Sequence, residues 1–358
     1  MTNPAIIVGG GLACLYAGYL LAKRNIEFKI LEANYRLGGR ILCEPHSSRS
    51  DNILRLDMGP AWFWPHQIEM ITLMQTLQVD YFLQYNIGDA LFEADEHSPI
   101  ERFKPSFLES YRVTGGMQQL VDKLASLLPD DVIELDCPVD RVEVIDSAWQ
   151  LSSRKQDVPV FSTRQLILAT PPRVIVDKLE LAGEKWQALK RQLTGVPTWM
   201  AAQAKFVASY RQPFWREQGL SGQVFSRQGP MVEIHDSSAD ENDGFALFGF
   251  IGIPASHRQK ISHHELKQLC LVQLSKIFGD QALDVEQTYL TDWASNEFIA
   301  SEADRNEQPG HPSIDLNPWR QVLIERGLYF AGSEVATRDA GYLQGALIAA
   351  SAAVATLS

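Results

Sequence analysis

Three consecutive glycines near the start of the chain have the type and spacing of a phosphate-binding turn. They occupy residues 9–11, between an apolar run at residues 5–8 and a stretch with apolar residues at helical spacing, residues 12–24. Gly9 allows the chain to turn sharply, and Gly11 lets the backbone approach a pyrophosphate because no Cβ stands in the way. The helix that follows offers unpaired N–H groups and a partial positive charge to phosphate oxygens. This arrangement predicts a binding site for a dinucleotide.

An acidic residue stands where such a site requires one. A second apolar run, residues 28–31, leads into Glu32, which lies about 20 residues beyond the glycines. Together these elements make a βαβ unit, in the order strand, glycine turn, helix, strand and acid. In such a unit the carboxylate, here that of Glu32, accepts hydrogen bonds from a ribose diol. Cys14 occupies the place of the third glycine, which serves close packing of helix on strand, and cysteine is small enough to replace it. The alternative is a βαβ unit without a ligand.

The residues that follow Glu32 distinguish between dinucleotides. Residues 32–40 read Glu-Ala-x-x-Arg-x-Gly-Gly-Arg. This stretch resembles the second signature of the FAD-dependent amine oxidase family, which includes monoamine oxidases, polyamine oxidases and L-amino-acid oxidases. The resemblance implies that FAD is the cofactor, that the Gly-Gly pair crosses its pyrophosphate, and that Arg40 neutralises the phosphates. The alternative is a Gly-Gly turn followed by a solvated arginine.

An aromatic-rich loop at residues 57–62 resembles the family's loop along the flavin. Gly59 permits close approach of the backbone to a flat ring. The resemblance implies that Trp62 forms a wall of the substrate pocket, and the alternative is ordinary packing. L-amino-acid oxidases carry a carboxylate-binding arginine at about the position of Trp62, so its absence counts against an amino-acid substrate.

Lys205 is the foremost candidate for a catalytic residue. Residues 205–215, which begin Lys-Phe and end Pro-Phe-Trp, resemble the family segment whose lysine hydrogen-bonds a water that faces flavin N5. The alternative is a solvated lysine on an alternating strand, since lysine is mostly exposed. Buried beside a flavin, the ammonium would be destabilised by desolvation, so we expect its pKa to be lowered.

The C-terminal part of the chain supplies a second half of the predicted cofactor site. Residues 328–334 form an apolar run that ends in a match to the family's third signature, Phe-Ala-Gly-x-Glu. The resemblance places Gly332 and Ser333 at the pyrophosphate and ribityl chain. The last helix opens at residues 341–345, and its N-terminus would face the flavin atoms where negative charge develops on reduction. Tyr342 matches an aromatic residue of the family's substrate cage.

Three further positions refine the expected cofactor and substrate. Trp293 opens a segment that resembles the family stretch supporting the flavin, and residues 299–302 lack the cysteine that binds FAD covalently in mitochondrial monoamine oxidases. We therefore expect non-covalent FAD. The family's second cage aromatic falls near Ala303, so the cage is incomplete in this sequence. Val139 matches the position that holds the adenine edge through its backbone, with a plain strand residue as the alternative.

Composition limits the classes of partner. The chain has 358 residues, of which 45% are hydrophobic and 21% charged, as in globular proteins, and its net charge is −12. Without a basic tract, it is not expected to bind nucleic acid or an anionic membrane. The four cysteines are far apart without a CxxC pair, which indicates reduced thiols in the cytoplasm and no metal site. The N-terminus lacks the basic region of a signal peptide, and the Ala-rich stretch at residues 345–357 is too short to span a bilayer.

These patterns predict an α/β fold: a Rossmann-like FAD-binding domain with an inserted substrate domain made of an antiparallel sheet and helices. Alternation at residues 200–210, 224–234 and 245–251 indicates the antiparallel strands, with a helix over 263–278 beside them. A sheet with helices, inserted into a nucleotide-binding domain, is the plan of the family. The predicted FAD-binding domain comprises residues 1–75, 105–175 and 286–358, and the predicted substrate domain comprises residues 76–104 and 176–285.

The expected activity is that of an FAD-dependent amine oxidase. By the resemblance, hydride passes from the carbon next to the amine nitrogen to flavin N5, the imine hydrolyses, and O2 reoxidises the flavin to give hydrogen peroxide. Two alternatives are a renalase-like or desaturase-like flavoenzyme with another small-molecule substrate, and a flavin-bearing scaffold or redox sensor without turnover. The predicted catalytic residues are Lys205, Tyr342 and Trp62, and the predicted cofactor-binding residues are Gly9, Gly11, Leu12, Ala13, Glu32, Ala33, Gly39, Arg40, Met58, Gly59, Pro60, Ala61, Val139, Trp293, Gly332, Ser333, Gly341, Tyr342 and Leu343.

Overall fold

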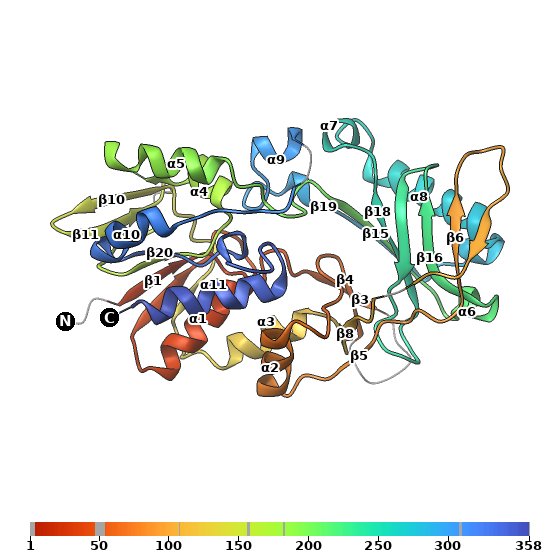
Figure 1. The fold of residues 1–358 in the computed structure, drawn as a ribbon, viewed down its shortest axis with the longest axis horizontal. Coiled ribbons are helices and arrows are strands. Elements are labelled where there is room, and N and C mark those ends of the chain that lie inside the picture. Colours follow the sequence, from red (N-terminus) through yellow and green to blue (C-terminus); the bar gives the residue numbers. More distant parts are fainter. Residues whose placement is uncertain are drawn as a thin grey trace.

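The computed structural model describes residues 4–46, 54–106, 108–155, 158–181, 183–307 and 310–357. Two lobes lie side by side along the long axis, and both ends of the chain belong to the same lobe (Figure 1). A five-stranded parallel sheet forms the centre of that lobe. Its strands, in spatial order, are β20 (Leu328–Phe330), β13 (Leu166–Leu168), β1 (Ala5–Val8), β2 (Phe28–Leu31) and β9 (Ile133–Glu134).

Helices and a small sheet cover both faces of this parallel sheet, which explains why most residues of its strands are apolar. Successive residues of a strand point to opposite faces, so Ile7 joins one core while Ile6 and Val8 join the other. The first core includes α1 (Leu12–Lys23), α2 (Ile68–Leu77), α3 (Gln118–Ser126) and α11 (Leu343–Ala355); the second includes α4 (Pro172–Lys178), α5 (Gln187–Thr194), α10 (Arg320–Arg326) and the sheet of β10 (Arg141–Ile145), β11 (Ala148–Ser152), β12 (Phe161–Thr163) and β14 (Glu180–Leu181).

A seven-stranded sheet dominates the second lobe (Figure 1). Its strands, in spatial order, are β19 (Gln287–Asp292), β15 (Ala204–Ser209), β18 (Ala246–Ile251), β17 (Met231–Asp236), β16 (Leu220–Ser226), β6 (Asp89–Glu93) and β7 (Glu101–Phe103). The pairing is antiparallel except between β16 and β6, so the sheet is mixed towards one edge. The predicted run 224–234 divides into parts of two strands joined by a turn. α8 (His263–Phe278) packs on one face of the sheet and has the predicted bounds.

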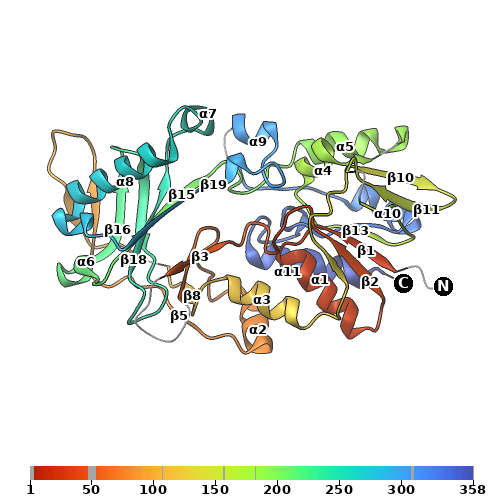
Figure 2. The same cartoon turned by 180° about the vertical axis from the view of Figure 1, so that it is seen from behind.

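Short strand pairs lie between the two lobes in both ribbon views (Figures 1 and 2). They are β3 (Cys43–His46) with β4 (Leu54–Asp57), and β5 (Tyr81–Leu83) with β8 (Tyr111–Val113). Two short helices, α7 (Ala255–Arg258) and α9 (Glu302–Asn306), lie next to each other across the same junction, and α6 (Phe214–Glu217) precedes β16.

The division into two domains stays a proposal, with two boundaries moved. β14 and α5 pack in the core of the first lobe, although residues 176–285 were predicted to belong to the substrate domain, so we propose that the FAD-binding part extends through α5. β19 pairs with β15 in the seven-stranded sheet, although residue 285 was predicted to end the substrate domain. Strand pairing continues to Asp292, because Asp292 lies opposite Ala204. We therefore propose that the FAD-binding part resumes after Asp292.

Two kinds of feature are absent from the residues that the structure describes. None of their helices is both long and apolar enough to cross a membrane. In the same ranges, no group of three or more His, Cys, Asp and Glu side chains is placed to hold a metal ion. All four cysteines are free thiols.

Candidate active site

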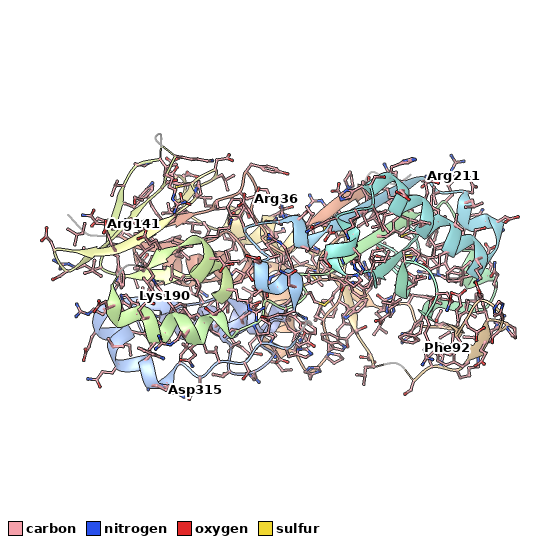
Figure 3. All side chains as sticks on the ribbon, turned by 90° about the horizontal axis from the view of Figure 1, so that it is seen from above. Arg36, Phe92, Arg141, Lys190, Arg211 and Asp315 are labelled. Carbon is pink, nitrogen blue, oxygen red and sulfur yellow. The ribbon has the colours of Figure 1, made fainter. Side chains whose placement is uncertain are left out.

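A cavity of about 1420 Å³ lies at the junction of the lobes and is lined by residues of both. It exceeds the roughly 300–1,000 Å³ of a site for a drug-sized ligand, which leaves room for an extended dinucleotide together with a substrate. Arg36 lines this cavity near the middle of the long axis, whereas Arg141 and Arg211 lie towards opposite ends (Figure 3). Every predicted site residue except Gly332 lines the cavity. Gly332 serves packing instead, because a Cβ there would come within 2.9 Å of the Thr170 carbonyl oxygen.

Two helix N-termini, one from each end of the chain, open onto the cavity. α1 begins after Gly11 and α11 begins after Tyr342; neither end has a side-chain cap, and neither first turn holds an acidic residue. Both helices belong to one hydrophobic core, which fixes their N-termini relative to each other. Uncapped N–H groups at the positive end of a helix dipole bind anions. Leu12, Ala13 and Leu343 line the cavity at these two ends.

Two glycines of the predicted site serve different purposes. At Gly11 the backbone has φ −80°, which any residue adopts, and a Cβ would meet no protein atom closer than 3.9 Å. At Gly59 a Cβ would lie 1.9 Å from the Arg40 carbonyl oxygen, so the fold itself requires glycine there. Gly11 therefore leaves open a cradle that a ligand would fill, as expected for close approach to a pyrophosphate.

Arg40 joins the N-terminal and C-terminal parts of the site. Its guanidinium lies 2.7 Å from Oε1 of the fully buried Glu334 and donates to the Ser333 hydroxyl at 2.9 Å and to the Trp199 carbonyl oxygen at 3.1 Å. Glu334 already balances much of the charge of Arg40. A bound pyrophosphate would therefore depend on the two helix N-termini as well as on Arg40, which was predicted to neutralise it.

The far end of the cavity carries the residues predicted to hold the adenosine. Glu32, Ala33 and Val139 line it, and Glu32 is nearly buried. Its Oε1 accepts a hydrogen bond from the Asn34 N–H at 2.7 Å, which fixes the carboxylate at the end of β2. Burial raises the pKa of Glu32, while the hydrogen bond from Asn34 opposes the shift. The carboxylate is thus fixed beside the cavity, and its hydrogen bonding to a ribose diol stays a prediction.

Lys205 is buried in the wall of the cavity, with 1% of its surface exposed. Its ammonium donates to the Gly59 carbonyl oxygen at 3.1 Å and lies 4.0 Å from the centre of the Phe248 ring. Burial lowers the pKa of Lys205 from 10.5 to about 7; the Asp57 carboxylate opposes the shift and the Arg112 guanidinium adds to it. A lysine with this pKa can gain or lose a proton near neutral pH.

The lowered pKa of Lys205 predicts how the stability of the protein depends on pH. Lys205 has a lower pKa folded than unfolded, so the unfolded chain binds more protons between about pH 7 and 10.5. The free energy of unfolding of the wild-type protein is therefore expected to rise by about 1.4 kcal/mol for each pH unit of increase across that window, relative to Lys205→Met. Urea unfolding of both apoproteins at several pH values measures the difference. Parallel stability curves for the two proteins would contradict it.

The loop at residues 57–62 is held from two sides by buried groups. Asp57 Oδ2 accepts a hydrogen bond at 3.2 Å from the buried Arg112, and the Trp293 indole donates to the Met58 carbonyl oxygen at 3.1 Å. Trp293 thus supports the loop that was predicted to run along the flavin. No sequence pattern indicated Arg112 as a site residue. Its one signal in the sequence is a charged residue within a short apolar strand.

Trp62, Trp199 and Tyr342 are aromatic residues that line the cavity. Trp62 packs against His235, with ring centroids 5.1 Å apart. The ring centroid of Tyr342 lies 5.9 Å from that of Trp199, a residue that no sequence pattern indicated. Ala303, where the second cage aromatic was expected, lies in α9 and lines a separate pocket. The aromatic residue beside Tyr342 is thus Trp199, which comes from a different part of the chain than the expected position at Ala303.

Comparison with known proteins identifies the family. Residues 79–357 match the family described as flavin containing amine oxidoreductase, and residues 7–77 match the NAD(P)-binding Rossmann-like domain. The chain is 27% identical over 212 residues to putrescine oxidase of Kocuria rosea, covering 54% of this chain and 41% of that protein. It is 25% identical over 240 residues to flavin-containing amine oxidase B of Sus scrofa, covering 66% of this chain and 45% of that protein. The chain spans about half the length of the curated relatives it matches.

Solved structures share the fold at low identity. Cyclohexylamine oxidase from Brevibacterium oxydans has a TM-score of 0.80 at 18% identity, covering 99% of this chain and 98% of that one. Putrescine oxidase bound to putrescine has a TM-score of 0.77 at 20% identity, with the same coverage. The family match extends over most of the sequence, and the cavity offers the open glycine cradle and the two helix ends that a flavin dinucleotide needs. The chain belongs to the family of flavin-containing amine oxidoreductases, whose cofactor is FAD.

Proposed function

We propose that the protein oxidises an amine with non-covalently bound FAD and O2 as the electron acceptor. The observation that carries this proposal is Lys205, buried in the cavity wall with its pKa lowered to about 7. When bound, FAD supplies a two-electron acceptor for the hydride on the carbon next to nitrogen, and O2 then takes both electrons to give hydrogen peroxide while the imine hydrolyses.

The side chains have distinct roles in this proposal. Lys205 holds a water at its Nζ and exchanges a proton there, because its pKa lies near the working pH. The N-terminus of α11, after Tyr342, stabilises negative charge in the cavity. Trp62 and Tyr342 bound the substrate space and exclude water from it. Residues 299–302 contain no cysteine, which supports a cofactor without a covalent bond.

An anaerobic screen tests the proposed function. The purified protein is expected to be yellow, to release FAD on acid or heat treatment, and to lose its flavin absorbance when mixed with an amine in a stopped-flow instrument. Amino acids and dihydronicotinamides form the other arms of the screen. A protein without FAD, or one whose flavin is reduced by those compounds and by no amine, would refute amine oxidation. Admitting O2 then tests the acceptor through peroxide formation.

A further inference from the structure

Arg112 is a buried cation that does not reach the cavity. It lies in β8, between the two lobes, and it is not among the residues that line the cavity wall. A buried guanidinium is destabilising unless it is paired with an opposite charge and hydrogen-bonded. Because its charge is not presented to a ligand, the contacts of Arg112 indicate which parts of the chain it holds in place.

The Arg112 guanidinium joins the loop at residues 57–62 to the seven-stranded sheet. Its Nη2 donates to Asp57 Oδ2 at 3.2 Å and to the hydroxyl and carbonyl oxygens of Ser237 at 3.4 and 3.5 Å. Asp57 ends β4 and begins the loop, whereas Ser237 directly follows β17. One side chain thus fixes the loop to the sheet that carries Lys205.

Asp57 is held on both of its carboxylate oxygens. Its Oδ2 accepts from Arg112, and its Oδ1 accepts hydrogen bonds from the Met117 N–H at 2.8 Å and from the Cys43 thiol at 3.0 Å. The side chain is almost fully buried, and hydrogen bonds to an ionised group are the strong ones. The start of the loop is therefore fixed by three separate parts of the chain.

The position of Asp57 determines that of Gly59, which contacts Lys205. The Gly59 carbonyl oxygen, two residues after Asp57, accepts a hydrogen bond from the Lys205 ammonium at 3.1 Å. Among the described residues, it is the one acceptor of that ammonium, whose other close neighbour is the Phe248 ring, with its centre 4.0 Å away. A displacement of Gly59 would therefore change the surroundings of the nitrogen that exchanges a proton.

Arg112 and Asp57 also act on Lys205 through their charges, in opposite directions. Burial is the largest cause that lowers the pKa of Lys205; the Asp57 carboxylate raises this pKa and the Arg112 guanidinium lowers it further. An opposite charge nearby favours the ammonium, and a like charge disfavours it. Replacing one member of the pair should therefore have the opposite effect on Lys205 from replacing the other.

Other titratable groups on the strands around Lys205 are shared by every variant in the test. They are Cys43 on β3, Glu233 and His235 on β17, and Asp292 on β19. Phe250 lies opposite both Lys205 and Glu233, and Asp292 is bound by Arg258 at 2.6 Å. Because all of these groups stay in place, they do not produce a difference between the variants.

We propose that Arg112 is a positioning residue for amine oxidation: it holds Asp57, and through Asp57 the Gly59 carbonyl oxygen, so that the Lys205 ammonium stays at one point of the cavity wall. This inference rests on the proposed function and assigns how that site is kept in order. Without Arg112, the Asp57 carboxylate loses its buried counter-charge and favours the ammonium form of Lys205, which cannot accept a proton.

The pH profile of flavin reduction tests this inference in the FAD-bound protein. With the amine that reduces the wild-type flavin fastest, the inflection expected near pH 7 should move up by about one pH unit in Arg112→Met. The limiting rate at pH 7 should then fall about fivefold and recover by pH 9. Arg112→Lys keeps a positive charge beside Asp57 and should retain the wild-type inflection. Asp57→Asn keeps an acceptor for the Met117 N–H without the negative charge, so its inflection should move down.

Urea unfolding in excess FAD gives a second measurement that needs no substrate. Each protein is compared with the same protein carrying Lys205→Met, so that the general loss of stability in a variant cancels. The difference between the two begins to grow at the pH where folded Lys205 loses its proton. That pH is expected to be higher than in wild type for Arg112→Met and lower for Asp57→Asn.

Arg173→Met is the matched control. Arg173 is also a buried arginine, and it is paired at 2.9 Å with the buried Asp304, which likewise accepts a backbone N–H, that of Thr198. Neither member of this pair lines the cavity, so the variant should lose stability and keep the wild-type inflection. The flavin spectrum and the thermal midpoint verify that each variant is folded and loaded.

Two results overturn the inference and leave amine oxidation standing. One is an inflection that stays at the wild-type pH in both Arg112→Met and Asp57→Asn, and the other is an equal shift in Arg173→Met. If Arg112→Met does not fold, the direction of the shift in Asp57→Asn decides. If no amine reduces the flavin, the proposed function fails, and the unfolding measurements alone decide whether Arg112 and Asp57 act on Lys205.

Discussion

Gly11→Val is expected to leave the apoprotein folded and to weaken FAD binding by about 100-fold or more, equivalent to about 2.7 kcal/mol. The backbone at Gly11 has a conformation open to every residue, and a Cβ there meets no protein atom closer than 3.9 Å. The added isopropyl group would instead occupy the cradle at the N-terminus of α1, where the pyrophosphate must approach the backbone. Titration of the apoprotein with FAD, followed by flavin fluorescence, measures the affinity.

Two other glycines make this experiment specific. Gly310 lies outside the cavity, and a Cβ there would be 3.8 Å from its nearest neighbour, a ring carbon of Pro197, so Gly310→Val controls for the added bulk. Gly59→Ala should behave differently from both, because its Cβ would lie 1.9 Å from the Arg40 carbonyl oxygen and the apoprotein itself should be destabilised. Unchanged FAD affinity in a folded Gly11→Val protein would show that the cofactor does not approach the backbone at this turn.

The parts of the fold that could be predicted depend on local patterns. Residues 5–8 and 28–31 are strands because apolar runs of that length, bounded by glycines and polar residues, are buried from both faces of a parallel sheet. α8 spans the predicted 263–278 because Ser262 caps its first turn and Gly279 ends it. Each of these features is encoded within a few residues of the place where it occurs.

The parts of the site that could not be predicted depend on distant pairings. Arg40 meets Ser333, 293 residues further along the chain, and no local pattern encodes that contact. Glu233 lies in a run whose alternation was recognised, but the register between β17 and β18 shifts between Met231 and Glu233. A shift of one residue changes the face to which a side chain points, so the sequence did not reveal that Glu233 faces the cavity.

Lys205→Met is expected to slow the anaerobic reduction of the flavin by an amine by about 100-fold or more, the effect of removing a group that exchanges a proton in the transition state. Methionine fills a similar volume within the buried site, but it can neither hold a proton nor donate a hydrogen bond to the Gly59 carbonyl oxygen. Stopped-flow measurement of the limiting rate of reduction at saturating amine separates this effect from weaker substrate binding.

The pH profile distinguishes proton exchange at Lys205 from simple support of the cavity wall. With a pKa of about 7, the ammonium of Lys205 is mostly charged below neutral pH and mostly neutral above it. Only the neutral amine can accept a proton, so the wild-type rate should rise through pH 7 and then level off. Lys205→Met should lack this inflection, whereas Lys260→Met, at an exposed lysine, should keep it. A slow Lys205→Met protein that retained the inflection would assign the titration to another group, because a residue that only supports the wall changes the rate at every pH by the same factor.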